Sequence, residues 1–492
     1  YIHPPPVAAN MLQLSQGSHP AQQRLIFEEL VAHQVSLLSR RAYIQQIEAP
    51  RISASRQFAK QLLSSLPFEM TNAQKRVSKE IVQDLKLNKP MLRLVQGDVG
   101  AGKTLVAGVA ACHVLEEGWQ VALMAPTEIL AEQHYLNFKK WFEPLGLSVS
   151  WLSGKQKGKA RAAAEQAIVD GTAHLVVGTH ALFQDNVRFA KLGLVIIDEQ
   201  HRFGVDQRLA LRNKGAQNMT PHQLVMTATP IPRTLAMSAY GDLDTSVIDE
   251  LPPGRTPIQT VTIPLDRREE VLQRIASNCL EGKQAYWVCT LVEESETLDA
   301  QAAEATYLEI KERFPELNIG LVHGKMKADE KQAVMQQFKA NELQLLIATT
   351  VIEVGVDVPN ASIMVIENAE RLGLSQLHQL RGRVGRGAKA SFCALLYKSP
   401  LSQNGQERLR IMRETNDGFL IAEKDLEIRG PGELLGTKQT GDMGFRVAKL
   451  ERDNHLLNQA HYVAAQILKD YPRNAEALLK RWLPEAPRYA YV

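Results

Sequence analysis

The sequence contains little cysteine, and its four cysteines are scattered along 492 residues. They are Cys112, Cys279, Cys289 and Cys393, and most of them lie in apolar runs. No two have the spacing of metal ligands, which argues against a structural zinc site and against a disulfide framework.

Long apolar runs and an excess of one charge are missing as well. No apolar stretch approaches the ~18 residues of a membrane-spanning helix, and no secretory segment is recognisable. Lys and Arg total 57 against 54 Asp and Glu, a net charge of +3. This balance does not by itself indicate nucleic-acid binding. One local basic cluster, Lys155, Lys157, Lys159 and Arg161, fits either a phosphate contact or a solvated face. We expect a protein of a reducing cytoplasm without membrane contact.

A complete phosphate-binding loop is present, with the sequence GDVGAGKT at 97–104. The run at 91–96 predicts a buried strand before it, and 105–115 predicts an apolar helix after it. Glycines at such a junction let backbone N–H groups face phosphate oxygens, and the helix adds the positive end of its dipole. Lys103 is expected to reach the β- and γ-phosphates and Thr104 to hold Mg²⁺. The residues expected to bind the nucleotide here are Gly97, Asp98, Val99, Gly100, Ala101, Gly102, Lys103 and Thr104.

Two carboxylates follow a second buried strand. In LGLVIIDEQH at 192–201, the apolar run ends in Asp198 and Glu199. Ligands of open α/β sheets bind at the carboxyl ends of the strands. Asp198 is expected to orient the water shell of Mg²⁺, and Glu199 to polarise the water that attacks the γ-phosphorus. An isolated acidic pair would be interpreted as a solvated turn, but the phosphate loop upstream favours the catalytic interpretation.

A basic, glycine-rich segment lies in the other half of the chain. QLHQLRGRVGRG at 376–387 carries Arg381, Arg383 and Arg386. Arginines separated by small residues can approach phosphate oxygens bidentately, as an arginine finger does. Buried-strand patterns flank the segment, so it belongs to a folded domain and not to a flexible tail. An arginine finger on one domain and a phosphate loop on the other would place ATP between the two domains, as in a motor protein.

Apolar strands alternate with helical patterns in two successive stretches, which predicts two parallel-sheet α/β domains. The strands expected in the first are 91–96, 120–124, 174–178, 193–197 and 223–227. Those expected in the second are 285–290, 318–322, 343–348, 363–367 and 391–397. LPPGRTP at 251–257 predicts a hinge, because proline and glycine interrupt regular structure. The expected domains are a helical connector at 1–66, α/β domains at 67–252 and 258–399, and a C-terminal helical module at 400–492.

In this order, the motifs resemble those of superfamily 2 helicases, whose two RecA-like domains clamp ATP. Further matching segments are 67–74, 125–133, 178–183, 226–234, 321–326 and 348–360. Closer still, DEQHRFGVDQR at 198–208 and the stretch 420–441 resemble the RecG family of bacterial branched-DNA translocases. This resemblance covers effectively the whole chain. It implies two RecA-like parallel-sheet domains with an N-terminal helical connector and a C-terminal helical-hairpin module.

The resemblance also implies residue roles that spacing does not assign. Gln74 would bond the adenine edge, and Phe68 would stack on the base. Gly355 and Asp357 would approach the ribose and the γ-phosphate from the second domain, with Arg383 and Arg386 as the finger charges. The residues implied to couple the nucleotide site to the DNA path are His201, Thr227, Thr229 and Gln379, and in the hairpin and loop Arg429, Glu433 and Gln439.

The implied function is an ATP-dependent double-stranded DNA translocase and helicase that remodels stalled replication forks and Holliday junctions, with ATP and Mg²⁺ as cofactors. Its implied partners are branched and duplex DNA and a single-strand DNA-binding protein, and it is expected to be a monomer associated with the bacterial nucleoid. RecG proteins begin with a wedge domain that this sequence does not show, so we expect a fragment that begins in the connector.

Three alternatives to this function stay open at this point. They are a translocase like the transcription-repair coupling factor, an RNA helicase, and a nucleotide-gated DNA clamp without turnover. The DEQH motif and the module at 405–441 favour a DNA translocase over an RNA helicase. Intact Lys103, Glu199 and Arg386 argue against the clamp.

Overall fold

The structure is a computed structural model that describes most of the chain. The described residues are 11–53, 56–154, 156, 158–184, 186–199, 214, 219–231, 243–252, 255–290, 296–353, 358–387, 390–429 and 445–483.

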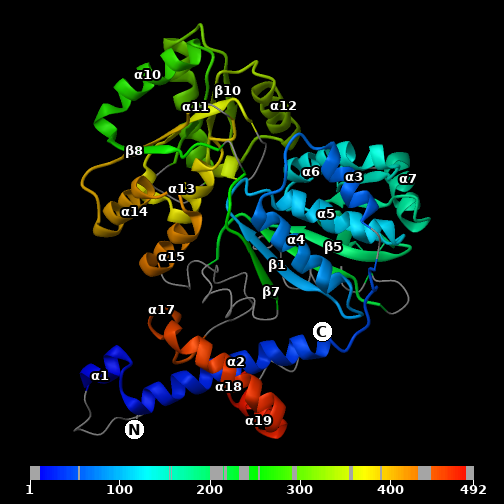
Figure 1. Ribbon diagram of the computed structural model, residues 1–492. Coiled ribbons are helices and arrows are strands. Elements are labelled where there is room, and N and C mark those ends of the chain that lie inside the picture. The colour runs from blue at the N-terminus through cyan, green and yellow to red at the C-terminus, as the bar shows by residue number, and fades with distance from the viewer. Residues whose placement is uncertain are drawn as a thin grey trace.

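The first half of the chain forms a seven-stranded parallel sheet in the order β3-β4-β2-β5-β6-β1-β7 (Figure 1). Alternate side chains of β5 enter opposite cores, since Leu194 and Ile196 join one cluster and Val195 and Ile197 the other. Burial on both faces explains the continuous apolar runs. The strands are β1 (Leu92–Gly97), β2 (Gln120–Met124), β3 (Val149–Leu152), β4 (Leu175–Gly178), β5 (Leu192–Asp198), β6 (His222–Thr227) and β7 (Asp244–Ile248). The helices around it are α3 (Gln57–Ser65), α4 (Asn72–Leu85), α5 (Lys103–Glu116), α6 (Glu128–Phe142) and α7 (Gly158–Val169).

A second parallel sheet of six strands has the order β10-β11-β9-β12-β13-β8. Its strands are β8 (Gln259–Pro264), β9 (Gln284–Val288), β10 (Ile319–Val322), β11 (Leu345–Ala348), β12 (Ala361–Ile366) and β13 (Phe392–Tyr397). The helices that follow its strands are α10 (Arg268–Leu280), α11 (Glu296–Arg313), α12 (Ala328–Lys339) and α13 (Leu374–Arg381). Two cores again cover the two faces of this sheet.

The prediction of two parallel-sheet α/β units is confirmed, and all ten predicted strands are present within a few residues. Three further strands, β3, β7 and β8, were missed. Each lies at the edge of its sheet. The two sheets fall within 67–252 and 258–399, and those domain boundaries themselves stay predictions.

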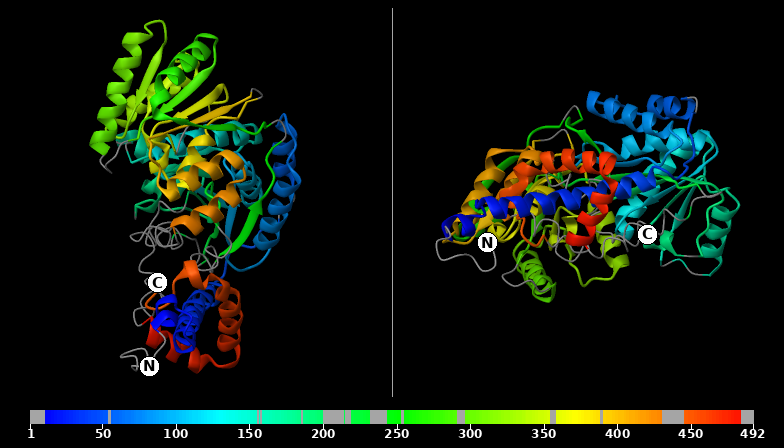
Figure 2. Two further views of the ribbon diagram at one scale, coloured as in Figure 1. Left: turned by 90° about the vertical axis from the view of Figure 1, so that its left-hand side faces the viewer. Right: turned by 90° about the horizontal axis from the view of Figure 1, so that it is seen from below.

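The C-terminal region consists of two helical groups with different neighbours. The hairpin of α14 (Gln403–Glu414) and α15 (Gly418–Arg429) packs against α13 of the second sheet. The helices α17 (Leu450–Asp453), α18 (Leu457–Asp470) and α19 (Pro472–Trp482) form a bundle with the N-terminal α2 (Pro20–Ile44), which α1 (Met11–Gln16) precedes. Figure 1 and the left-hand view of Figure 2 show this bundle below the two sheets, and α18 packs against α2. The two ends of the described chain are therefore packed together.

A buried carboxylate connects α2 to the chain segment that leads into the C-terminal helices of the bundle. Glu29 of α2 is only 6% exposed and accepts hydrogen bonds from three successive backbone N–H groups, those of Arg446, Val447 (2.9 Å) and Ala448 (2.8 Å). These N–H groups lie outside regular structure, so the carboxylate is their partner and fixes the chain as it enters the bundle.

No helix in the described ranges is long and apolar enough to cross a membrane.

We predict that Glu29→Gln lowers the melting temperature of the transition that contains the bundle by about 4–8 °C, since losing charged hydrogen bonds costs roughly 2 kcal/mol. Differential scanning calorimetry measures this change. Glu476→Gln on α19 is the matched control, because Glu476 is exposed and pairs only with Lys480 in the contacts seen. Equal melting temperatures for the two variants would refute the anchoring role of Glu29.

Candidate active site between the two sheets

The phosphate loop connects β1 to α5, as predicted. Gly100 (φ 78°) and Gly102 (φ 84°) adopt the left-handed conformation that favours glycine. Gly102 also has no room for a side chain, since a Cβ there would lie 2.2 Å from Nε2 of Gln74. Lys103 begins α5 and is buried, and its Nζ donates to the carbonyls of Gly97 (2.6 Å) and Asp98 (2.9 Å). Burial lowers the pKa of Lys103, and the carboxylates of Glu199, Asp198 and Asp98 oppose that shift.

The proposed adenine-reading residue lies directly under this loop. Gln74 is buried and completes a capping box with Thr71 at the start of α4. Its Nε2 donates to the carbonyl of Ala101 at 2.8 Å. Gln74 thus supports the phosphate loop, and its contact with an adenine stays a prediction. Phe68 is 53% exposed, so its ring is accessible to a base.

Two carboxylates stand at the carboxyl end of β5. Asp198 ends the strand, and its Oδ2 lies 2.7 Å from Nε2 of His134. Glu199 has φ 54°, an uncommon value for a residue with a side chain. Strained backbone of this kind concentrates at functional sites. The Glu199 carboxylate accepts from the N–H of Ala228 at 3.1 Å. Burial, followed by the negative charge of Asp198, raises the pKa of Glu199 to about 7, while Lys103 lowers it.

The turn after β6 connects Glu199 to the second sheet. The hydroxyl of Thr227 lies 3.5 Å from Glu199 Oε2 and accepts from the N–H of Thr229 at 3.2 Å. The hydroxyl of Thr229 accepts from Nε2 of Gln379 on α13. Three predicted coupling residues, Thr227, Thr229 and Gln379, therefore form a continuous hydrogen-bonded path that starts at Glu199.

Helix α13 and the segment between the two sheets also contact the phosphate loop. His378 Nε2 lies 2.6 Å from Asp98 Oδ1, and Arg255 Nη1 donates to the carbonyl of Val99 at 2.6 Å. A Cβ on Gly382 would lie only 2.9 Å from the Cβ of Val99. Burial raises the pKa of Asp98, but the hydrogen bond and charge of His378 outweigh it, so the pKa lies below its usual value.

The three arginines at and after the end of α13 have different surroundings. Arg381 is 1% exposed and donates to the carbonyls of Met412 (2.7 Å) and Thr415 (2.9 Å). It therefore ties α13 to α14 instead of facing the nucleotide site. The positive charge of Arg383 lowers the pKa of Glu199, and that of Arg386 lowers the pKa of Lys103. Both predicted finger arginines are therefore close enough to act on the site electrostatically.

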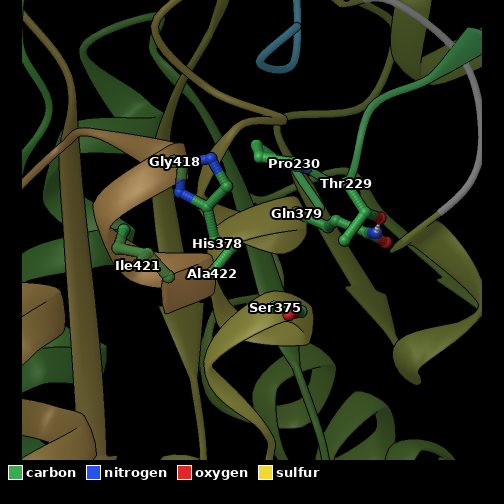
Figure 3. A pocket seen from close by; sticks show the side chains of 8 residues that line it. All are labelled: Thr229, Pro230, Ser375, His378, Gln379, Gly418, Ile421 and Ala422. Carbon is green, nitrogen blue, oxygen red and sulfur yellow. Dashed lines mark hydrogen bonds between the residues drawn. The ribbon is translucent and has the colours of Figure 1, made fainter. Parts of the chain in front are cut away.

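A small crevice lies where the Thr229 turn, α13 and α15 meet (Figure 3). In the close-up, the side chains of Gln379 and Thr229 point toward one another, while His378 lies beside α15. The lining residues are Thr229, Pro230, Ser375, His378, Gln379, Gly418, Ile421 and Ala422.

Several predicted residues lie outside the described part of the chain, namely His201, Gly355, Asp357, Glu433, Gln439 and the side chain of Arg429. Their roles stay predictions. Lys155 and Lys157 of the basic cluster are outside it too.

Three residues that the structure brings to the site were not predicted: His134, Arg255 and His378. Each adjoins or lies within a segment already singled out, His134 directly after the motif at 125–133, Arg255 in the hinge at 251–257 and His378 in the arginine segment. Their partners are 64, 156 and 280 residues away, however, and could not be identified from local spacing.

Comparisons with known proteins agree with this geometry. The family model for DEAD/DEAH box helicases matches residues 71–238, and that for the helicase conserved C-terminal domain matches 267–388. A third model, ATP-dependent DNA helicase RecG, domain 3, C-terminal, matches 415–482.

Individual relatives point to the same family. The chain is 62% identical over 491 residues to the ATP-dependent DNA helicase RecG of Escherichia coli (strain K12), covering 99% of this chain and 71% of that protein. The corresponding protein of Haemophilus influenzae is 60% identical, with the same coverage. A solved structure of RecG bound to a three-way DNA junction matches with a TM-score of 0.73 and 42% identity, covering 89% of this chain and 57% of that one. This chain belongs to the RecG family of ATP-dependent DNA helicases.

Proposed function

We propose that ATP is bound and hydrolysed between the two sheets. Lys103 would hold the transferring phosphate, Glu199 would act as the base, and Arg383 and Arg386 would supply positive charge from the second sheet. The observation that carries this proposal is the contact of α13 with the phosphate loop, through His378–Asp98 and Gly382–Val99. The family's ATP-dependent helicase activity requires such a shared site.

The residues present fit a magnesium ion. Mg²⁺ prefers oxygen ligands and keeps several waters, so one or two protein groups plus substrate phosphates suffice. Thr104 offers a hydroxyl on the first turn of α5, and Asp198 offers a carboxylate at the end of β5. Within the described ranges no three His, Cys, Asp or Glu residues are grouped to hold a metal. When bound, the metal would neutralise phosphate charge.

The function supported by family membership is ATP-dependent remodelling of branched DNA, such as stalled forks and Holliday junctions. A RecG chain of similar fold has been solved on a three-way DNA junction, and we infer the same substrate class here. The match of 415–482 to the RecG-specific model favours this function over RNA unwinding. We further propose action as a monomer in the bacterial cytoplasm, on nucleoid DNA and with a single-strand DNA-binding protein as partner.

We propose that α15 transmits the state of the nucleotide site. Asp425 of α15 is 1% exposed and accepts hydrogen bonds from the N–H groups of Leu374 (3.3 Å) and Ser375 (3.2 Å), and from the Ser375 hydroxyl (2.7 Å). A carboxylate at a helix N-terminus is favoured by the unpaired N–H groups and the helix dipole. Because α13 carries both His378 and Gln379, its movement on nucleotide binding would carry α15 with it.

Substitutions in the nucleotide site test the proposed chemistry. Lys103→Ala should abolish turnover, and Glu199→Gln should bind ATP but hydrolyse it roughly 10²–10⁴-fold more slowly, the usual contribution of a positioned base. Arg386→Ala should lose about 10³-fold or more if it is the finger. DNA-stimulated ATPase assays, paired with binding of a fluorescent ATP analogue, measure both steps.

Lys139→Ala is the control for these variants, since Lys139 lies on the exposed side of α6 and pairs with Glu143. It should keep the parent rate. Near-normal turnover in Arg386→Ala would transfer the finger role to Arg383, and near-normal turnover in Glu199→Gln would refute the base assignment.

Substitutions around α15 test the proposed coupling. Asp425→Ala should keep DNA-stimulated ATPase within about 3-fold of the parent, because it leaves the groups that act on ATP in place. It should lose most displacement of a third strand from duplex DNA. Asp417→Ala is the matched control, since the Asp417 carboxylate caps α15 through the N–H groups of Phe419 and Leu420 and, among the described residues, makes no hydrogen bond to α13. Equal strand displacement by both variants would show that the α13–α15 link transmits nothing.

A further inference from the structure

His134 stands out on the buried face of α6. The other buried residues of that helix are apolar, namely Ala131, Phe138 and Phe142, at the spacing of one helical face. His134 is 4% exposed, and its ring packs near Phe138 with ring centroids 6.4 Å apart. A polar ring in an apolar stripe loses its hydration, so it must be compensated by a specific partner.

That partner is the carboxylate of Asp198. The distance from Nε2 of His134 to Oδ2 of Asp198 is 2.7 Å, the length of a charge-assisted hydrogen bond. An ionised carboxylate only accepts, so Nε2 is the donating nitrogen in this pair. The other ring nitrogen, Nδ1, is buried and has no hydrogen-bond partner among the described residues. Only one of the two ring nitrogens is therefore satisfied by a hydrogen bond. Packing alone would not require a buried ring that leaves its other nitrogen unsatisfied.

The contact fixes one oxygen of a functional carboxylate. A carboxylate held at Oδ2 cannot rotate freely about its Cβ–Cγ bond, so the direction of Oδ1 is set as well. Metal-binding carboxylates commonly depend on such outer hydrogen bonds, whose loss weakens metal affinity. His134 comes from α6, which follows β2, and β2 pairs with β5 next to Asp198. Rigid elements on both sides therefore hold the pair.

We propose that His134 is a positioning residue that orients Asp198 towards the water shell of Mg²⁺. This inference rests on the metal role proposed above for Asp198. It assigns a function to a residue of α6 that, within the described residues, touches neither the phosphate loop nor the finger arginines.

Magnesium-dependent binding of N-methylanthraniloyl-ATP tests the proposal without relying on turnover. His134→Phe keeps the ring shape but removes the donor, and it should raise the half-saturating Mg²⁺ concentration by roughly 10–100-fold. Binding of the analogue in EDTA should stay at the parent level. His134→Gln places an amide N–H close to the position of Nε2 and should restore the Mg²⁺ requirement to within about 3-fold of the parent.

Two controls separate the possible outcomes. His113→Phe alters another buried histidine, on α5, and should leave the Mg²⁺ requirement unchanged. Asp198→Asn should raise it at least as much as His134→Phe. If Asp198→Asn raises the requirement and His134→Phe does not, the positioning role is wrong while the metal site stands.

If Asp198→Asn has no effect either, the proposed metal role of Asp198 is wrong and the inference falls with it. Should His134→Phe fail to fold, His134→Asn replaces it, because its shorter amide keeps polarity but does not reach Asp198. His134→Asn is then expected to show the Mg²⁺ defect, and a parent-like requirement would overturn the proposal.

Discussion

The close approach of Gly382 to Val99 is the constraint on which the rest of the site depends. A Cβ at position 382 would lie 2.9 Å from the Cβ of Val99, a separation that folded proteins do not tolerate. Glycine there lets the end of α13 sit directly on the phosphate loop. The His378–Asp98 hydrogen bond and the Arg255 contact with Val99 then form around the same point. The end of α13 and the phosphate loop therefore meet in several close contacts.

The two sheets contribute different parts of the chemistry. The first supplies a buried cluster of Lys103, Asp198 and Glu199, in which the two carboxyl groups partly offset the effect of burial on the pKa of Lys103. The second supplies further positive charge through Arg383 and Arg386. Glu199, the proposed base, lies at the end of β5, while the proposed finger arginines follow α13. The proposed site is therefore shared between the two sheets.

Much of this arrangement could be predicted from the sequence. The phosphate loop and the acidic pair are local motifs, and their flanking strands are apolar runs that burial on both faces produces. The missed strands β3, β7 and β8 are edge strands, so they are half-covered and carry polar residues or proline, as in Asp244–Ile248 and Gln259–Pro264. The contacts of His134, His378 and Asp425 join residues 50 to 280 positions apart, and only the folded chain brings them together.

The central claim is that the nucleotide site acts on α15 through α13. Hydrogen–deuterium exchange with and without a non-hydrolysable ATP analogue tests it directly, because the amides of all three segments are followed at once. The account predicts slower exchange on nucleotide binding in 97–104, in 374–381 and in 418–429. Protection confined to 97–104, with unchanged exchange in α13 and α15, would contradict it.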